Sequence, residues 1–182
     1  MKKNIVLCVC LIVTSILYCQ TIAPTVNKTN LRGEKEGLWI TYFKKDKLIA
    51  NYKDGKYDGP IYRLQSNNNI LYFGQFKNGK YDGIWYWFDK QGQCVSKITI
   101  LNANNKIMII QKDMNKKVSC EVEAYEIDYY CNMKIKAEGK ILFNNGDSVE
   151  MGEFLNHGIW KYYDTNGNCI QTIDETGVWH HS

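Results

Sequence analysis

Apolar and polar residues alternate over short segments along most of the chain, and turn-forming pairs separate these segments. Residues 48–52 and 70–76 carry apolar or aromatic side chains at intervals of two, and they are followed by Asp54-Gly55 and Asn78-Gly79. Such alternation is typical of half-buried β-strands. Asp-Gly and Asn-Gly favour tight hairpins because both turn residues adopt positive φ at little cost. The pattern therefore predicts an all-β protein built from short hairpins.

The hairpins recur as a sequence repeat. Segments 52–59 and 76–83 are identical at six of eight positions, and the segment that begins at Gly83 matches the one that begins at Gly158. Each copy has a glycine, an apolar residue two positions later and another three positions beyond. The glycines are Gly37, Gly59, Gly83 and Gly158, followed by Trp39 and Tyr42, Ile61 and Leu64, Trp85 and Phe88, and Trp160 and Tyr163. Because each copy spans about one hairpin, tandem copies predict an elongated antiparallel meander.

This repeat resembles the MORN repeat, in particular the MORN-variant class found in many bacterial exported proteins. The Gly-x-Trp-x-x-aromatic motifs at Gly37, Gly83 and Gly158 carry the resemblance, together with Gly-Lys-Tyr-Asp-Gly between copies. The resemblance is good over residues 33–97, partial over 139–173 and poor over 99–137. It implies the hairpin-repeat fold and a scaffold or contact surface, because modules of this type serve unrelated systems. Some relatives are labelled antitoxin-like.

The N-terminus has the pattern of a secretory signal peptide. Lys2 and Lys3 precede an apolar run over residues 5–13, and polar residues follow. This run is short for a membrane-spanning helix, which needs about 20 residues. We expect residues 1–19 to be removed and the protein to be exported to the periplasm, the medium or the outer membrane. The alternative is a lipid anchor at Cys19, because residues 16–19 faintly resemble a lipobox.

The predicted organisation after the leader is a flexible linker over residues 20–30, MORN-like repeats over 31–98 and 139–176, and a tail over 177–182. A diverged hairpin is expected over residues 99–138. The alternation there changes phase at Tyr125-Glu126, which predicts a reversal that places Cys120 opposite Cys131. Opposed strand residues have Cα atoms about 4.5–5.5 Å apart, close enough for a disulfide. The alternative is one long bulged strand with two separate buried thiols.

Charge and motifs exclude several function classes. Loss of the two leader lysines lowers the formal net charge from +4 to +2, which is too balanced to indicate nucleic-acid binding. No nucleotide loop and no Cys or His spacing typical of metal ligands is present, so we expect no metal and no cofactor. We expect no enzyme. A catalytic set would most plausibly lie within residues 111–130, at Glu121, Glu123 or Asp128.

Aromatic residues provide the main indication of a binding surface. Trp85 and Trp87 share one face of a predicted strand, Trp160 and Tyr162 repeat that pair, and Tyr86 lies on the other face. These rings either form the cross-strand ladder that joins repeats, which is their more common role, or form a partner-binding strip. The strip would comprise Trp39, Trp85, Trp87, Trp160 and Tyr162. The expected function is a non-enzymatic scaffold that binds a protein or the envelope surface. An antitoxin-like or immunity partner is the alternative.

Overall fold

The fold is all-β. A computed structural model describes residues 25–104, 106–112, 115–145 and 154–178, which form thirteen strands and no helix. The strands are β1 (Lys28–Thr29), β2 (Lys35–Phe43), β3 (Asp46–Lys53), β4 (Lys56–Leu64), β5 (Ile70–Lys77), β6 (Lys80–Phe88), β7 (Cys94–Asn102), β8 (Ile107–Gln111), β9 (Lys116–Cys120), β10 (Val122–Tyr129), β11 (Ile135–Phe143), β12 (Leu155–Tyr163) and β13 (Cys169–Asp174).

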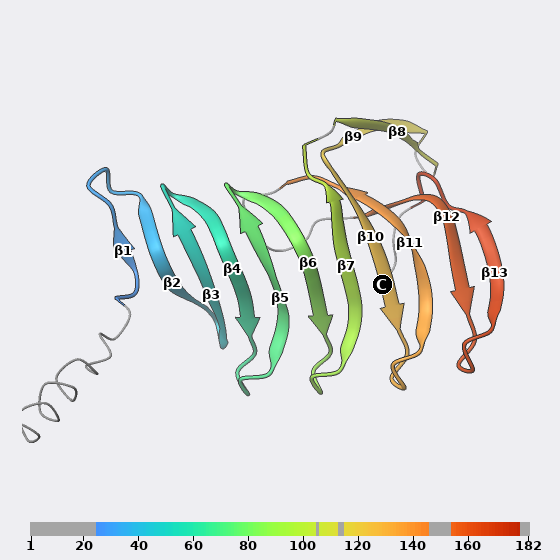
Figure 1. The fold of residues 1–182 in the computed structure, drawn as a ribbon, viewed down its shortest axis with the longest axis horizontal. Helices are drawn as coiled ribbons and strands as arrows, with labels where there is room; N and C mark the ends of the chain where they lie inside the picture. Colours follow the sequence, from blue (N-terminus) through green and yellow to red (C-terminus); the bar gives the residue numbers. More distant parts are fainter. Residues whose placement is uncertain (1–24, 105, 113–114, 146–153, 179–182) are drawn as a thin grey trace, which may run out of the picture.

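Eleven strands form one antiparallel sheet, in the order β1-β2-β3-β4-β5-β6-β7-β10-β11-β12-β13 (Figure 1). The predicted meander of consecutive hairpins is therefore confirmed. β8 and β9 pair only with each other and form a separate hairpin beside one end of the sheet (Figure 1). None of the described residues belongs to a helix long and apolar enough to cross a bilayer.

Each repeat is one hairpin whose two strands pair in a nearly constant register. In four hairpins the residue at the tryptophan position of the first strand pairs with the residue thirteen positions later. These pairs are Ile61 with Gly74, Trp85 with Ile98, Glu126 with Gly139, and Trp160 with Ile173. In the hairpin of β2 and β3, the corresponding pair is Trp39 with Ala50.

The hairpin of β10 and β11 is a repeat that the sequence pattern did not reveal. Glu126 occupies its tryptophan position, and Ala124 stands where other copies have the initial glycine. Its turn is also the repeat turn, because Tyr130 N–H donates to the carbonyl of Lys134, as Asp89 N–H donates to Gln93. The described part of the chain therefore contains five repeats, of which two lack a tryptophan at this position: Ile61 stands there in one and Glu126 in the other.

The predicted reversal at Tyr125-Glu126 is wrong. β10 continues through both residues and turns only after Tyr129, so the hairpin with β11 crosses the expected boundary at residues 138 and 139. The apolar phase changes within a continuous strand because Glu126 and Asp128 occupy buried positions on one face. Tyr125 and Ile127 lie on the other face. A periodicity argument that counts only apolar residues cannot follow such a strand.

The predicted Cys120–Cys131 disulfide is also absent, and both thiols are free. Cys120 lies at the end of β9, where it pairs with Ile107 and is buried. Cys131 is exposed in the turn after β10. The insertion of β8 and β9 separates the two cysteines, so that the alternative of one long strand carrying two buried thiols is wrong as well.

Tryptophans of the first strands pack over glycines of the neighbouring strands. The ring of Trp85 lies against Gly74 of β5, and the ring of Trp160 lies against Gly139 of β11. We call the side of the sheet that carries Trp39, Trp85, Trp87 and Trp160 the tryptophan face; the cross-strand pairs place these side chains on the same side.

The opposite face is partly covered by the β8–β9 hairpin. Ile109 and Cys120 of this hairpin form a buried cluster with Leu142 of β11 and Leu155 of β12. Elsewhere on the opposite face, Phe73 of β5 stacks on Tyr86 of β6, with ring centroids 4.9 Å apart, and remains 38% exposed. The inserted hairpin thus buries the part of the opposite face that it covers, and Ile49 of β3 is a further buried residue on that face.

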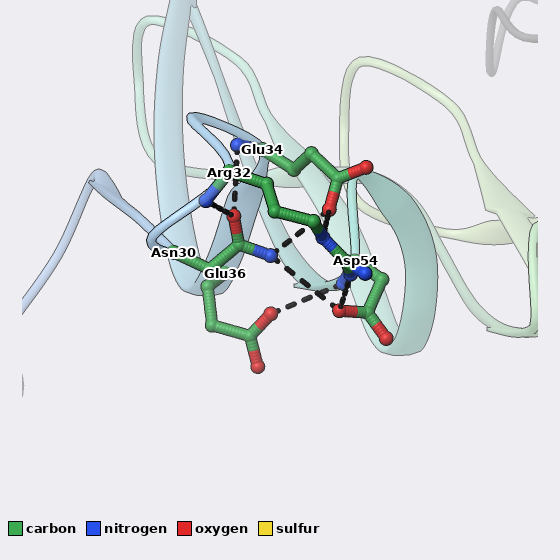
Figure 2. A network of polar contacts seen from close by, with 5 residues as sticks. All are labelled: Asn30, Arg32, Glu34, Glu36 and Asp54. Carbon is green, nitrogen blue, oxygen red and sulfur yellow. Dashed lines mark hydrogen bonds and ion pairs between the residues drawn. The ribbon is translucent and has the colours of Figure 1, made fainter.

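A network of polar side chains closes the N-terminal edge of the sheet (Figure 2). Asn30 Oδ1 accepts hydrogen bonds from the backbone N–H groups of Arg32 and Glu34, at 2.9 and 3.0 Å. The guanidinium of Arg32 pairs with Glu34 and with Asp54 of the β3–β4 turn, at 2.8 and 2.5 Å. Glu36 accepts from the N–H of Asp54. The network ties the segment between β1 and β2 to the next turn.

Some residues predicted to lie in the flexible linker or in the tail are part of the fold. Lys28 and Thr29, expected in the linker, form β1 and pair with Glu36 and Lys35. Val178, expected in the tail, accepts a hydrogen bond from Asn156 N–H through its carbonyl. The predicted signal peptide, the lipidation candidate Cys19 and residues 179–182 lie outside the described residues.

We predict that Gly74→Ala lowers the free energy of unfolding by about 1–3 kcal/mol, because the new Cβ would lie 2.1 Å from Trp85 Cδ2 and force the ring to move. Gly92→Ala is the comparison, since its Cβ meets nothing closer than 3.9 Å and its φ of 85° imposes only backbone strain. Urea titration measures both. An equal or smaller loss for Gly74→Ala would contradict the packing argument.

The hairpin of β10 and β11, which we call the cryptic repeat, gives a second prediction through its turn. Met133 has a φ of 63° at the position held by Gly92 and Gly167 in other copies. Met133→Gly should therefore raise the free energy of unfolding by about 1 kcal/mol, because a side chain in the left-handed region costs energy. The control is Cys131→Gly in the same turn. Cys131 is exposed and has no positive φ, so this substitution should lower the free energy of unfolding. Thermal unfolding of both variants tests this, and no gain at Met133 would refute it.

Candidate functional site

The predicted binding residues all lie on the tryptophan face, but they differ in accessibility. Trp85 and Trp160 are 0% and 1% exposed and belong to the core. Trp39, Trp87 and Tyr162 pack against that core and remain half-buried. Only these three of the five predicted residues are therefore placed to touch a partner.

The buried rings form the cross-strand ladder that the sequence pattern favoured. Ring contacts run continuously from Trp39 through the first three repeats, with neighbouring centroids 4.6–6.0 Å apart. The series is Trp39, Tyr52, Tyr57, Phe76, Tyr81 and Trp85. Such contacts stabilise neighbouring strands against one another. The ladder is structural, and the half-buried rings form its accessible margin.

Two buried carboxyl groups interrupt the aromatic series in the cryptic repeat. Glu126 takes the position of Trp85 and Trp160, and Asp128 takes that of Trp87 and Tyr162. They are 1% and 9% exposed. Because each lies two strands from the neighbouring aromatic pairs, it is about 10 Å from them across the sheet. The tryptophan face therefore carries an acidic centre with an aromatic pair on each side.

Three of the four cross-strand neighbours of the two acids have a small side chain or none, and the fourth is Ile98 beside Glu126. Ser96 of β7 and Ala137 of β11 pair with Asp128 on its two sides, and Gly139 pairs with Glu126. The hydroxyl of Ser96 donates a hydrogen bond of 2.7 Å to Glu126 Oε1. Large rings at these positions would fill the space that the carboxyl groups occupy. The small neighbours thus accommodate the acids within the sheet.

Burial raises the pKa of both acids. For Glu126 the loss of hydration is the largest cause and the nearby charge of Asp128 adds to it, whereas the Ser96 hydrogen bond acts in the opposite direction. Burial also raises the pKa of Asp128, and the positive charge of Lys136 partly offsets this effect. A buried pair of like charges disfavours double ionisation, so this centre responds to pH and to any cation nearby.

Lys35 shows how the tryptophan face accommodates a cation. Its ammonium nitrogen lies 4.8 Å from the ring centroid of Trp39 and 4.6 Å from that of Tyr52. These distances are in the range of cation–π attraction. The aromatic surface of this face thus already holds one positive charge of the chain.

The acids considered for a catalytic set do not converge. Glu121 is exposed and accepts a hydrogen bond from Asn145, and Glu123 lies on the opposite face, where it pairs with Lys140 at 2.8 Å. Asp128 alone lies on the tryptophan face, beside Glu126. Sequence reasoning missed Glu126, and only an alignment of the cryptic repeat with the others would have identified its position.

The glycines and the aromatic residues of the repeat motif differ in backbone conformation and in exposure. Gly37, Gly59, Gly83 and Gly158 all have positive φ, between 66° and 109°. Tyr42 is 71% exposed, and Phe88 and Tyr163 are half-buried. Tyr163 donates a hydrogen bond of 2.5 Å from its hydroxyl to Glu138. Tyr42, Phe88 and Tyr163 lie at or next to the ends of their strands, whereas the four glycines lie within theirs.

No protein-family model, curated protein or solved structure matches this chain. The resemblance to MORN-variant repeats therefore depends on the repeat motifs themselves.

The buried carboxyl group predicts a pH-dependent stability. Because folding raises the pKa of Glu126 to about 8, its protonation stabilises the fold. This contribution is complete below the unfolded pKa of about 4.5 and is lost as the pH rises through about 8. The free energy of unfolding of Glu126→Gln should therefore fall less than that of the parent between pH 4.5 and pH 8. At pH 9 the variant should be more stable than the parent by roughly 2–4 kcal/mol.

Chemical unfolding at several pH values measures this effect. Glu123→Gln is the control, because Glu123 is half-buried on the opposite face and ion-paired. If the stability of Glu126→Gln followed the same pH curve as the parent, the buried carboxyl group would not be responsible.

Proposed function

We propose that this chain is an exported, non-enzymatic repeat protein of the MORN-variant type that binds a protein partner through its tryptophan face. The half-buried rings of Trp87 and Tyr162, with the acidic centre between them, carry this proposal. Aromatic side chains that keep part of their surface accessible at the centre of a rigid sheet are typical of interface anchors. The proposed export is based on the leader pattern. The alternative is an exported protein that is anchored by a lipid at Cys19.

The charge on this face favours a partner that presents a cationic side chain. Asp128 lies between Trp87 and Tyr162, and Tyr162 donates its hydroxyl to Glu175 at 2.5 Å. A lysine or arginine between the two aromatic pairs would contact rings and approach carboxylates at once. It would also favour the ionised state of the acids, whose pKa values burial raises.

The rigidity of the sheet supports a scaffold role. Trp87 and Tyr162 stand on two repeats of one continuous sheet, with the repeat of β10 and β11 between them, so their spacing does not depend on a loop. Sites built on strands hold their geometry without an ordering cost on binding. An immunity-type partner would use the same surface, and the identity of the bound protein distinguishes the two roles.

Site-specific photo-crosslinking in the producing cell tests this proposal. Benzoylphenylalanine at position 87 should crosslink to a discrete partner, because this position lies on the tryptophan face. The same residue at position 86 is the matched control, since Tyr86 is the adjacent half-buried aromatic on the opposite face.

The identified partner, once purified, should bind the parent at least about tenfold more tightly than it binds Trp87→Ala, while Tyr86→Ala binds as the parent does. Substituting the cationic side chains of the partner that crosslink should weaken binding to a similar degree. Crosslinks at position 86 alone, or equal losses for both alanine variants, would overturn the assignment to the tryptophan face.

A further inference from the structure

A polar trench lies at the end of the sheet from which the β8–β9 hairpin leaves. It consists of two adjoining cavities of about 610 and 510 Å³ that share Lys80, Ala103 and Asn104. The first cavity extends over the β5–β6 turn and the end of β7, and the second extends to the base of the hairpin and the end of β11. Volumes of 300–1,000 Å³ are typical of sites for small ligands.

The trench has positive charge that no ion pair neutralises within the described residues. Three lysines line it: Lys77, Lys80 and Lys106. Within the described residues, none of the three forms an ion pair. The lining also contains two carboxylates, Asp82 and Glu121, which accept hydrogen bonds from Gln75 and Asn145, so the lysines exceed the acids by one. An anion entering the trench would meet ammonium groups without displacing an internal ion pair.

Two of these lysines are directly opposed. Lys77 of β5 and Lys80 of β6 are cross-strand partners on either side of the turn. Like charges at opposed positions destabilise a strand pair. Lys80 Nζ also donates to Asn104 Oδ1 at 2.6 Å, which holds its ammonium over the part of the trench shared by the two cavities. A bound anion would relieve the repulsion between the two lysines.

Side-chain amides supply most of the remaining polar lining. Five asparagines contribute: Asn78, Asn102, Asn104, Asn144 and Asn145. Asn145 connects two other residues of the lining, since its amide nitrogen donates to the carbonyl of Ala103 and its oxygen accepts from Tyr81 N–H. The side chains of Asn78 and Asn144 make no hydrogen bond within the described part of the chain. Each amide offers both donors and an acceptor, which is the complement of a hydroxyl group.

We propose that this trench binds a small polyhydroxylated anion, namely a sugar that carries a phosphate or a carboxylate. The lysines contact the anionic group and the asparagines contact the hydroxyl groups. The trench lining includes Tyr81 of the aromatic ladder but neither Trp87 nor Tyr162, and this proposal does not depend on the function proposed for the tryptophan face.

Titration of the isotopically labelled protein with glucose 6-phosphate and with glucuronate, followed by NMR, tests the proposal. Both ligands should shift the side-chain amide signals of the trench asparagines. Glucose should bind at least about tenfold more weakly because it lacks the charge, and inorganic phosphate should bind more weakly because it lacks the sugar hydroxyls. Equal affinity for glucose, or for inorganic phosphate, would overturn the assigned ligand class.

Matched variants locate the site. The double variant Lys77→Gln, Lys80→Gln should weaken binding of both anionic sugars by about tenfold or more. The control is Lys53→Gln, Lys56→Gln, because this pair is opposed in the same way one repeat earlier and does not line the trench. Unchanged affinity in the first variant, equal losses in both, or amide shifts confined to another region would refute the proposal.

Discussion

Two of the repeats depend on the close packing of a large ring against a strand position that has no side chain. Trp85 over Gly74 and Trp160 over Gly139 bring an indole onto the backbone of the neighbouring strand. Because this contact requires one register, it aligns β6 with β5 and β12 with β11. Ring contacts also join the first three repeats from Trp39 to Trp85. These contacts stabilise a layer that, within the described residues, only the two-stranded β8–β9 sheet partly covers.

The cryptic repeat shows what the ladder tolerates. Gly139 is retained, but its cross-strand partner within the hairpin is Glu126 in place of an apolar residue. The ring of Trp160 still covers that glycine from β12, so the sheet keeps its register without a tryptophan on β10. The cost is a buried carboxyl group whose ionised form is disfavoured. A sheet designed for stability alone would carry an apolar residue there, which makes this position the most informative one on the tryptophan face.

The inserted hairpin of β8 and β9 has two separate consequences. It covers Leu142 and Leu155 on the opposite face, which the meander cannot bury by itself. Its departure from the sheet also opens the trench between the β5–β6 turn and the end of β11. The acidic centre and the trench therefore lie at the same interruption of the repeat series: the altered repeat carries Glu126 and Asp128, and the insertion before it borders the trench.

The hairpins were predictable because their signals are local: glycines with positive φ, Asn-Gly and Asp-Gly turns, and Gly-x-Trp motifs all act within a few residues. The fold class, the meander and the ladder therefore follow from the sequence. The burial of Glu126 and Asp128, the separation of Cys120 from Cys131 and the trench do not, because each depends on strands that are distant along the chain. Only the pairing of β10 with β7 and β11 decided which side chains lose water, and water loss determines their chemistry.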